Sequence, residues 1–293
     1  MMQPLFLRLF CLLFAAVPVL ASAETDINKA QVLRLYAMLD AGDYDDLAEV
    51  VAADYRTEVP DHEGMPALPQ GLDGLSASLT ERGAIANDVK RVVSDGDLVF
   101  VQVKYPGDRV IAGVDIFCLD DAGKIVHHWP RRQAVTDDVE DPETLYAGGG
   151  DASKPMTEEQ LQRNRTIIRE AFEKVWREGR AELTLDYYAT GYKQHNPHIA
   201  DGGERIRQII ETHVKPYIEE TGDLYPVEIV HIGAQGDLVF IHCNIVMVGL
   251  GRNEGVKTTS VDIMRIDDEG KLAEHWDVLQ METDSLPNFD TLF

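Results

Sequence analysis

Two aspartates and a histidine near the C-terminal end of the chain could together move a proton. Asp262 lies in an alternating segment before a DDEG turn, and His275 and Asp277 lie in a second alternating segment after it. If Ile266 pairs with Lys271 across the turn, Asp262 falls opposite His275, and the period of two places all three side chains on one face. Because carboxylates beside an imidazole form an acid/base group, this face is a candidate site of proton transfer.

Other polar residues should lie near this face. The segment QHNP follows the helices of this half, and the strand before Asp262 alternates polar with apolar residues. We predict catalytic roles for Asp277, Asp262, His275 and His195, substrate-binding roles for Asn196, His242, Asn244 and Met264, and no metal ligand. One alternative is that the polar face simply meets water, as in many alternating strands. Another is a metal site built from His195, His242, His275 and the aspartates, although their spacing matches no standard ligand motif.

An internal repeat shows which elements must position these residues. The segment 114–146 aligns without a gap on 261–293, so that DDAGKIVHHW matches DDEGKLAEHW. Upstream, GDLVF occurs at Gly96 and again at Gly236. A repeat of this length indicates two copies of one domain.

Each copy predicts helices followed by strands. The spacing of Val32, Leu35, Tyr36 and Leu39 is helical, and the matching segment of the second copy begins at Ile167. The GDLVF runs are rich in β-branched and aromatic residues, and the DDxG turns join alternating segments into hairpins. We therefore predict an α+β fold with two tandem domains, each an antiparallel sheet packed on N-terminal helices.

The first residues indicate an exported protein. Arg8 precedes an apolar run that ends in Ala21-Ser22-Ala23, which is typical of a signal peptide cleaved after Ala23. We predict a signal peptide over 1–23, a first domain over 24–146, a flexible linker over 147–156 and a second domain over 157–293. The location would be the periplasm or the exterior. The net charge of −24 disfavours nucleic acid and anionic membrane surfaces as partners, and no membrane contact is expected after cleavage.

Three blocks of the second copy resemble the SnoaL-like polyketide cyclase branch of the nuclear-transport-factor-2-like superfamily: YKQHNPHIADG, GDLVFIHCNIVMV and SVDIMRIDDEGKLAEHWDVLQ. The resemblance implies a cone-shaped domain in which a curved antiparallel sheet wraps around helices and encloses a pocket. It also implies that the face carrying Asp262 points into the cone. Cyclases of this family run an intramolecular aldol reaction with an Asp as acid/base and need no metal or cofactor. Family members commonly pair sheet to sheet, so the two copies could form a pseudo-dimer within one chain, or the chain could form homo-oligomers.

The first copy lacks several of the candidate residues. Asp115 and His128 are retained, but Glu58 stands for His195, Val59 for Asn196, Gln102 for His242 and Pro130 for Asp277. We therefore predict a degenerate first pocket and a working second one. The leading hypothesis is an exported, cofactor-free lyase or isomerase acting on a small carbonyl compound. Asp277 or Asp262 would be the base, and His195, Asn196 and His275 would donate hydrogen bonds to the enolate. The alternative is a small-molecule-binding protein without turnover.

Overall fold

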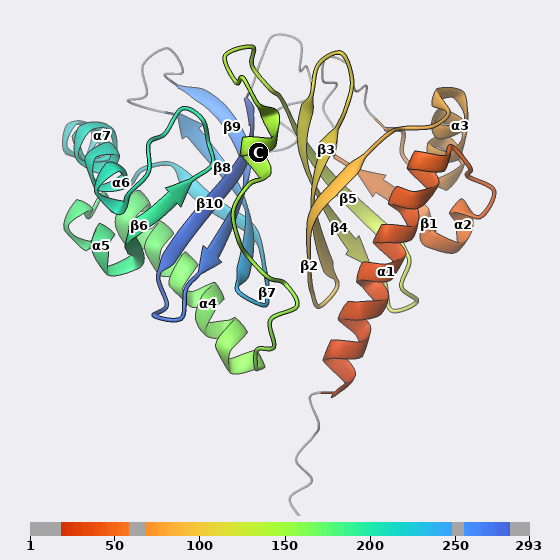
Figure 1. Ribbon diagram of the computed structural model, residues 1–293, viewed down its shortest axis with the longest axis horizontal. Coiled ribbons are helices and arrows are strands. Elements are labelled where there is room, and N and C mark those ends of the chain that lie inside the picture. Colours follow the sequence, from red (N-terminus) through yellow and green to blue (C-terminus); the bar gives the residue numbers. More distant parts are fainter. Residues whose placement is uncertain (1–18, 59–67, 248–254, 282–293) are drawn as a thin grey trace, which may run out of the picture.

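A computed structural model describes residues 19–58, 68–247 and 255–281, with side chains from residue 27 onward. Over these ranges the chain forms two halves, each with a five-stranded sheet and helices on one face of it (Figure 1). The α+β class and the tandem arrangement are thus confirmed. Residues 1–18 of the predicted signal peptide lie outside the described residues. None of the helices described is long and apolar enough to cross a membrane.

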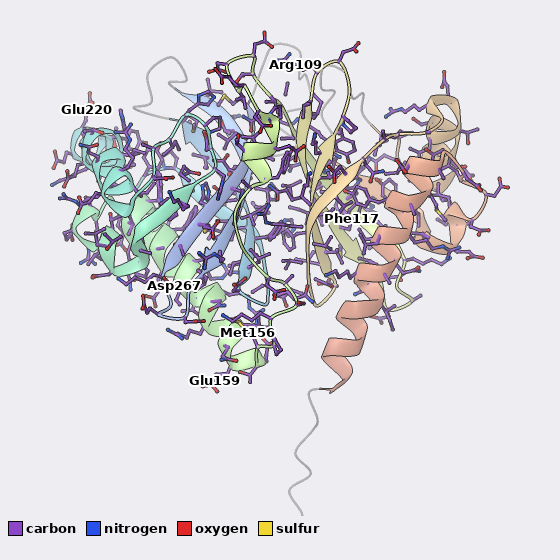
Figure 2. The ribbon with its side chains drawn as sticks, viewed as in Figure 1. Arg109, Phe117, Met156, Glu159, Glu220 and Asp267 are labelled. Carbon is purple, nitrogen blue, oxygen red and sulfur yellow. The ribbon has the colours of Figure 1, made fainter. Side chains whose placement is uncertain are left out.

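The elements of the first half follow the predicted order of helices and then strands. They are α1 (Val19–Ala41), α2 (Leu47–Val50), β1 (Val51–Thr57), α3 (Leu72–Arg82), β2 (Asp88–Asp95), β3 (Leu98–Tyr105), β4 (Ile111–Leu119), β5 (Ile125–Ala134) and the 3-10 helix η1 (Pro142–Tyr146). Phe117 of β4 lies between the sheet and α1, where its ring meets Tyr36 edge to face (Figure 2). The core of this half therefore lies between the sheet and its helices.

The second half repeats this plan with more helical segments. It contains α4 (Glu158–Ala171), the π-helical turn η2 (Phe172–Arg177), η3 (Ala181–Leu183), α5 (Thr184–Tyr187), β6 (Tyr188–Gln194), α6 (Gly203–Ile209), η4 (Ile210–Val214), α7 (Lys215–Thr221), β7 (Val227–Gln235), β8 (Leu238–Met247), β9 (Val256–Ile266) and β10 (Leu272–Met281). Thr157 and Gln160 form a capping box at the start of α4, which satisfies two backbone N–H groups of its first turn.

The two sheets have the same strand order. The first runs β1-β5-β4-β3-β2 and the second β6-β10-β9-β8-β7. Neighbouring strands are antiparallel except that β1 pairs with β5, and β6 with β10, in parallel. Each sheet is therefore mixed, and the prediction of a purely antiparallel sheet was wrong at this one strand.

The hairpin of β9 and β10 has a different register from the one predicted. Ile266 pairs with Leu272, and after an irregularity between Leu272 and Glu274 the partner of Asp262 is Asp277 rather than His275. The bulge takes up residues that a regular hairpin would pair. Because the shift is two residues, each side chain keeps its face. The predicted grouping of Asp262, His275 and Asp277 on one face therefore holds.

The outer faces of the two sheets pack against each other in the middle of the molecule, with the helices outside (Figure 1). β5 lies against β10, and β2 against β7. A shared apolar cluster fills the interface, and at its centre the rings of Phe100 and Phe240 lie 5.7 Å apart. The two halves thus bury their outer sheet faces on each other within one chain.

The Gly-rich segment between the halves is held in place. The indole nitrogen of Trp276 donates to the carbonyl of Ala147 at 2.8 Å, and the amide of Gly149 donates to the Glu274 carboxylate at 3.0 Å. A Cβ on Gly148, whose φ is +94°, would lie 2.1 Å from a carboxylate oxygen of Glu274. Glycine is needed here for close approach to the second sheet, and the flexibility of this segment stays a prediction.

Candidate functional site

The second domain brings Asp262, His275 and Asp277 together on the inner face of its sheet. Nε2 of His275 lies 2.9 Å from Oδ1 of Asp262, and one ligand atom from each of the three residues lies within 4.8 Å of the others. Asp262 and His275 are buried, whereas Asp277 is partly exposed. The cluster is therefore an interior ion pair with one accessible carboxylate beside it.

Neighbouring side chains fix each member of the cluster. Nδ1 of His275 faces Oε1 of Gln194 at 2.8 Å, so both ring nitrogens face oxygen acceptors, as in a doubly protonated imidazole. The amide nitrogen of Asn196 donates to both carboxylate oxygens of Asp277, at 3.1 and 2.9 Å. Ser260 donates to the second oxygen of Asp262 at 2.9 Å.

The surroundings shift two pKa values in the direction that acid/base chemistry needs. Burial raises the pKa of Asp277, and the charge of Asp262 adds to this effect against the opposing effects of His275 and Asn196. Burial alone would lower the pKa of His275, but the hydrogen bond to Asp262 and the charges of Asp277 and Asp262 outweigh it and raise the pKa. The site therefore pairs a carboxyl whose pKa is raised with an imidazole whose pKa is also raised.

His195 does not join this cluster. Its ring stacks on Trp276 at 4.7 Å, and Nε2 lies 3.1 Å from a carboxylate oxygen of Glu274, on the face that meets the first domain. The physical reason is the alternation of side chains along a strand. Gln194 of β6 pairs with His275 of β10 and shares its face, so the side chain of His195 points to the opposite face. Asn196, one residue further on, points back toward Asp277.

His242 and Asn244 also lie on the interface face, which corrects the prediction that they share the face of Asp262. The partner of Asp262 on β8 is Ile241, so the residue on the inner face is apolar and its neighbour His242 points outward. Met264 is on the inner face, paired with His275, and belongs to the apolar core. The metal site that would combine His195, His242 and His275 is therefore not assembled.

Each domain carries an acid and a histidine at the interface, but with the positions exchanged. His127 lies 3.1 Å from Glu58 in the first domain, and Glu274 lies 3.1 Å from His195 in the second. Glu58 matches His195 in the repeat, and His127 matches Glu274. Both copies therefore keep an acid–imidazole pair against the tryptophan of β5 or β10.

Arg131 reaches from the first domain into the second. Its Nε donates to Oγ1 of Thr259 at 2.9 Å, and a terminal nitrogen lies 3.1 Å from Nε2 of His242. Arginine can only donate, so Nε2 of His242 is the acceptor and its Nδ1 carries the proton, 3.0 Å from Nδ1 of His231. Burial, followed by the charges of Arg131 and His231, lowers the pKa of His242 to about 2. His242 is thus a neutral interface residue.

The first domain has a polar cluster of its own, centred on Asp115. This carboxylate accepts hydrogen bonds from Tyr36, from Tyr105 at 2.9 Å and from Arg132 at 2.6 Å, and lies 2.8 Å from Nε2 of His128. Although burial raises the pKa of Asp115, the charges of Arg132 and His128 outweigh it and hold the pKa well below the usual range. Asp115 is therefore a saturated anion and a poor base. The sequence could not show this, because Tyr36, Tyr105 and Arg132 come from separate segments.

The cluster closes one end of an apolar cavity of about 60 Å³ between the first sheet and its helices. Leu35, Leu39, Leu75 and Phe117 are among its lining side chains. Arg132 also lines it, and the Nε of this guanidinium is buried without a hydrogen-bond partner among the described residues. The first pocket, predicted to be degenerate, therefore retains an apolar body and an unused hydrogen-bond donor.

A second cavity, of about 20 Å³, lies where Asp277 meets the first domain. Asn196 and His198 border it on one side, and Gln133 and Thr136 of the first domain border it on the other. The predictions did not include His198, Gln133 or Thr136, since nothing in a single strand pattern shows which residues of the other domain approach Asp277. The two carboxylates and the imidazole could also hold a divalent cation. Binding would have to displace the proton shared by His275 and Asp262.

The sequence of each half matches a family model that describes a SnoaL-like domain, over residues 32–128 and again over 168–275. The chain belongs to the SnoaL-like family. Each match spans most of one sheet, so the tandem SnoaL-like domains predicted from the repeat and the resemblance are confirmed. No curated protein matches the chain.

Solved structures of similar proteins each cover less than half of the chain. An NTF-2 like protein of unknown function from Burkholderia xenovorans is 18% identical, with 43% of this chain and 97% of that chain covered and a TM-score of 0.34. A steroid delta-isomerase from Pseudomonas aeruginosa is 20% identical, covering 36% and 80%, with a TM-score of 0.31. An LEH-like epoxide hydrolase from M. tuberculosis is 16% identical, covering 41% and 85%, with a TM-score of 0.32.

Proposed function

We propose that the second domain is an acid/base site that transfers a proton on a small carbonyl compound, with Asp277 as the group that takes and returns the proton. The observation that carries the proposal is the environment of Asp277. It is the partly exposed member of the cluster, its pKa is raised, and it borders a cavity. A general base works best when its pKa is raised toward the working pH.

In this reaction the Asp277 carboxylate removes a proton from the carbon next to the carbonyl. The electron pair of the C–H bond moves into an enolate, and Asp277 returns the proton to another atom of the product. Asn196 orients the carboxylate through its two hydrogen bonds. Both nitrogens of His275 are already engaged, so it supplies positive charge beside Asp277 and does not donate to the enolate. His198 and Thr136 border the cavity beside Asp277, whose volume of about 20 Å³ holds about one water molecule, so a ketone would have to widen it.

The test measures, by proton NMR, how fast the hydrogens on the carbon next to a ketone carbonyl exchange with solvent deuterium. The substrates are ketones, such as cyclohexanone, whose exchange the wild-type protein accelerates. Asp277→Asn keeps the shape but removes the proton acceptor, so the rate should fall about a hundredfold or more. Because the folded protein raises the pKa of Asp277, ionisation of this group opposes folding at neutral pH, and Asp277→Asn should unfold at no lower temperature.

Asp223→Asn, a change at an exposed position, is the matched control and should exchange at the wild-type rate. A wild-type rate for Asp277→Asn would refute the role of Asp277. Loss of activity with EDTA that is restored by a divalent cation would show instead that the three residues act as metal ligands.

The alternative function, ligand binding without turnover, is favoured by one observation in the first domain. Its apolar cavity ends at a guanidinium whose Nε has no partner among the described residues, so a small apolar molecule carrying a carbonyl or hydroxyl would satisfy it. Leu39→Phe should fill this cavity. If it abolishes ligand binding while Asp277→Asn does not, and no compound is consumed, the binding function is the correct one.

The cellular location of the protein is also a proposal. A signal peptide over residues 1–23 would send the mature chain to the periplasm or the exterior. N-terminal sequencing of material from the periplasm should give Glu24 as the first residue. An intact Met1 in a membrane fraction would contradict the proposal.

A further inference from the structure

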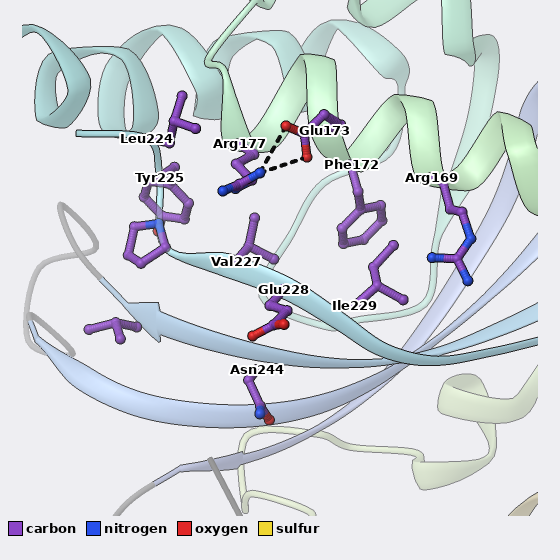
Figure 3. Close-up of a pocket in the computed structure, with 12 residues that line it drawn as sticks. Arg169, Phe172, Glu173, Arg177, Leu224, Tyr225, Val227, Glu228, Ile229 and Asn244 are labelled. Carbon is purple, nitrogen blue, oxygen red and sulfur yellow. Dashed lines mark hydrogen bonds and ion pairs between the residues drawn. The ribbon is translucent and has the colours of Figure 1, made fainter. Parts of the chain in front are cut away.

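An open groove of about 630 Å³ runs along β7 in the second domain, next to α4 (Figure 3). Asn244 lines it, is only 8% exposed, and has an Oδ1 without a hydrogen-bond partner among the described residues. Leu224 on its rim and Val230 of β7 are 46% and 44% exposed. A buried, unpaired acceptor beside exposed apolar side chains is unfavourable in water, so this surface is suited to being covered.

The first domain shows what covers the equivalent surface there. In the repeat, Val230 corresponds to Lys90 and Asn244 to Lys104, and both edge strands have an irregularity at this place. After β5, the chain crosses the first sheet as far as η1. Glu143 of η1 forms ion pairs with Lys90, at 3.0 Å, and with Lys104. The ammonium of Lys90 lies 5.3 Å from the centre of the Tyr146 ring.

The C-terminal segment is the counterpart, in the second copy, of the segment that ends in η1. Residues 282–293 follow β10 as 135–146 follow β5, and they lie outside the described residues. The matching positions include Leu286 for Val139, Asp290 for Glu143, Thr291 for Thr144, Leu292 for Leu145 and Phe293 for Tyr146.

The differences between the copies are chemically matched. Where Lys90 becomes apolar Val230, its aromatic neighbour Tyr146 becomes the more apolar Phe293. Where Lys104 becomes Asn244, the acid is retained as Asp290, which can accept from the side-chain N–H of Asn244, while a backbone N–H of the segment would have to satisfy the unpaired Oδ1.

We propose that residues 282–293 bind across this groove as residues 135–146 bind across the first sheet, with Phe293 over Val230 and Asp290 against Asn244. The end of β10 is well placed for this. Met281 lies level with Val227 through the pairings along β9 and β8. Three strand spacings, about 14 Å, separate the two strands. Twelve residues can span about 40 Å when extended, so the segment reaches the groove with length to spare.

Hydrogen exchange measured by mass spectrometry on the full chain tests the proposal. The double substitution Leu292→Ser with Phe293→Ser removes the apolar anchors, and amides of residues 227–230 should then exchange about tenfold faster. Residues 88–91, which the first domain covers with its own segment, should not change. Asp284→Ser is the matched control in the same segment, because its counterpart Asp137 is exposed. Unchanged exchange at 227–230 would overturn the proposal.

A second measurement does not depend on exchange rates. If Phe293 lies over Val230, then Val230→Ala and Phe293→Ala remove the same contact, and the double variant should lower the unfolding temperature by less than the sum of the single variants. Val230→Ala combined with Leu33→Ala, an exposed residue of α1, should be additive. Additive effects for the first pair would contradict the contact. Protection of residues 227–230 that grows with protein concentration would show that a second copy of the chain covers the groove, and would overturn the proposal.

Discussion

Gln133 and Gln280 make the same hydrogen bond in opposite directions across the domain interface. Oε1 of Gln133 accepts from the amide of Leu279 at 2.9 Å, and Oε1 of Gln280 accepts from the amide of Arg132 at 3.2 Å. The two glutamines occupy matching positions of the repeat, and so do the amides that they bind. The two halves therefore pack with approximate two-fold symmetry, like the subunits of an isologous dimer.

We expect Gln133→Ala and Gln280→Ala to destabilise the protein to a similar extent, because each leaves one buried backbone N–H without its acceptor. The free energy of unfolding should fall by about 1–3 kcal/mol in each variant. Denaturant unfolding measures both, with Gln162→Ala on the exposed face of α4 as the control. A loss confined to one of the two variants would show that the symmetry does not extend to energetics.

The interface should weaken in acid because of His242. Its pKa is lowered to about 2 in the folded protein, so between pH 6.5 and that value the unfolded chain binds more protons than the folded one. The stability that neutral His242 contributes is therefore fully present above pH 6.5 and is lost as the pH falls. At pH 5 the loss is about 2 kcal/mol for one histidine with an unfolded pKa of 6.5.

The variant His242→Gln carries the side chain that the first copy has at this position, Gln102, and should remove this part of the pH dependence. Unfolding curves at pH 5 and pH 7.5 test the expectation. An equal difference between the two pH values in wild type and variant would contradict it.

Asp115→Asn should destabilise the first domain strongly. The substitution leaves the buried guanidinium of Arg132 without its counter-charge, which typically costs 3–5 kcal/mol. The pKa of Asp115 is held low, so its stabilising effect is present above about pH 4 and is lost as the pH falls. Asp121→Asn in the exposed turn is the control. A shift below about 0.5 kcal/mol for Asp115→Asn would contradict the buried ion pair.

If Asp277 is the base, the rate of ketone exchange should depend on pH in a bell shape. The rate should rise as Asp277 ionises, at a pH above the ordinary pKa of an aspartate, and fall as His275 loses its proton above pH 6.5. His275→Gln should remove the alkaline limb. A wild-type profile that stays flat above pH 6.5, or the same profile in both proteins, would argue against the imidazolium.

The fold and the acid/base cluster could be predicted from the sequence because both rest on patterns that survive errors of register. The repeat fixed the two domains, and the two-residue error in the β9–β10 hairpin left Asp262, His275 and Asp277 on one face. Within one strand, alternate residues lie on the same face whatever the register with the neighbouring strand.

The positions of His195 and His242 could not be predicted in the same way, because they depend on how one strand pairs with the next. The inner face of β8 is occupied by Ile241, and the polar residues of this strand meet the other domain. An interface between domains accepts polar side chains that have partners across it, as His242 has in Arg131. A polar stripe in a strand therefore does not distinguish a pocket from an interface.

Arg131 makes the two halves non-interchangeable. Its counterpart in the second domain is Val278, and the counterparts of its partners His242 and Thr259 are Gln102 and Ala112. Two first domains would bring each arginine against an alanine, and two second domains would leave the threonine and histidine facing a valine. Joining the copies in one chain allows a contact that neither half could make with a second copy of itself, so each half has become a specific partner for the other.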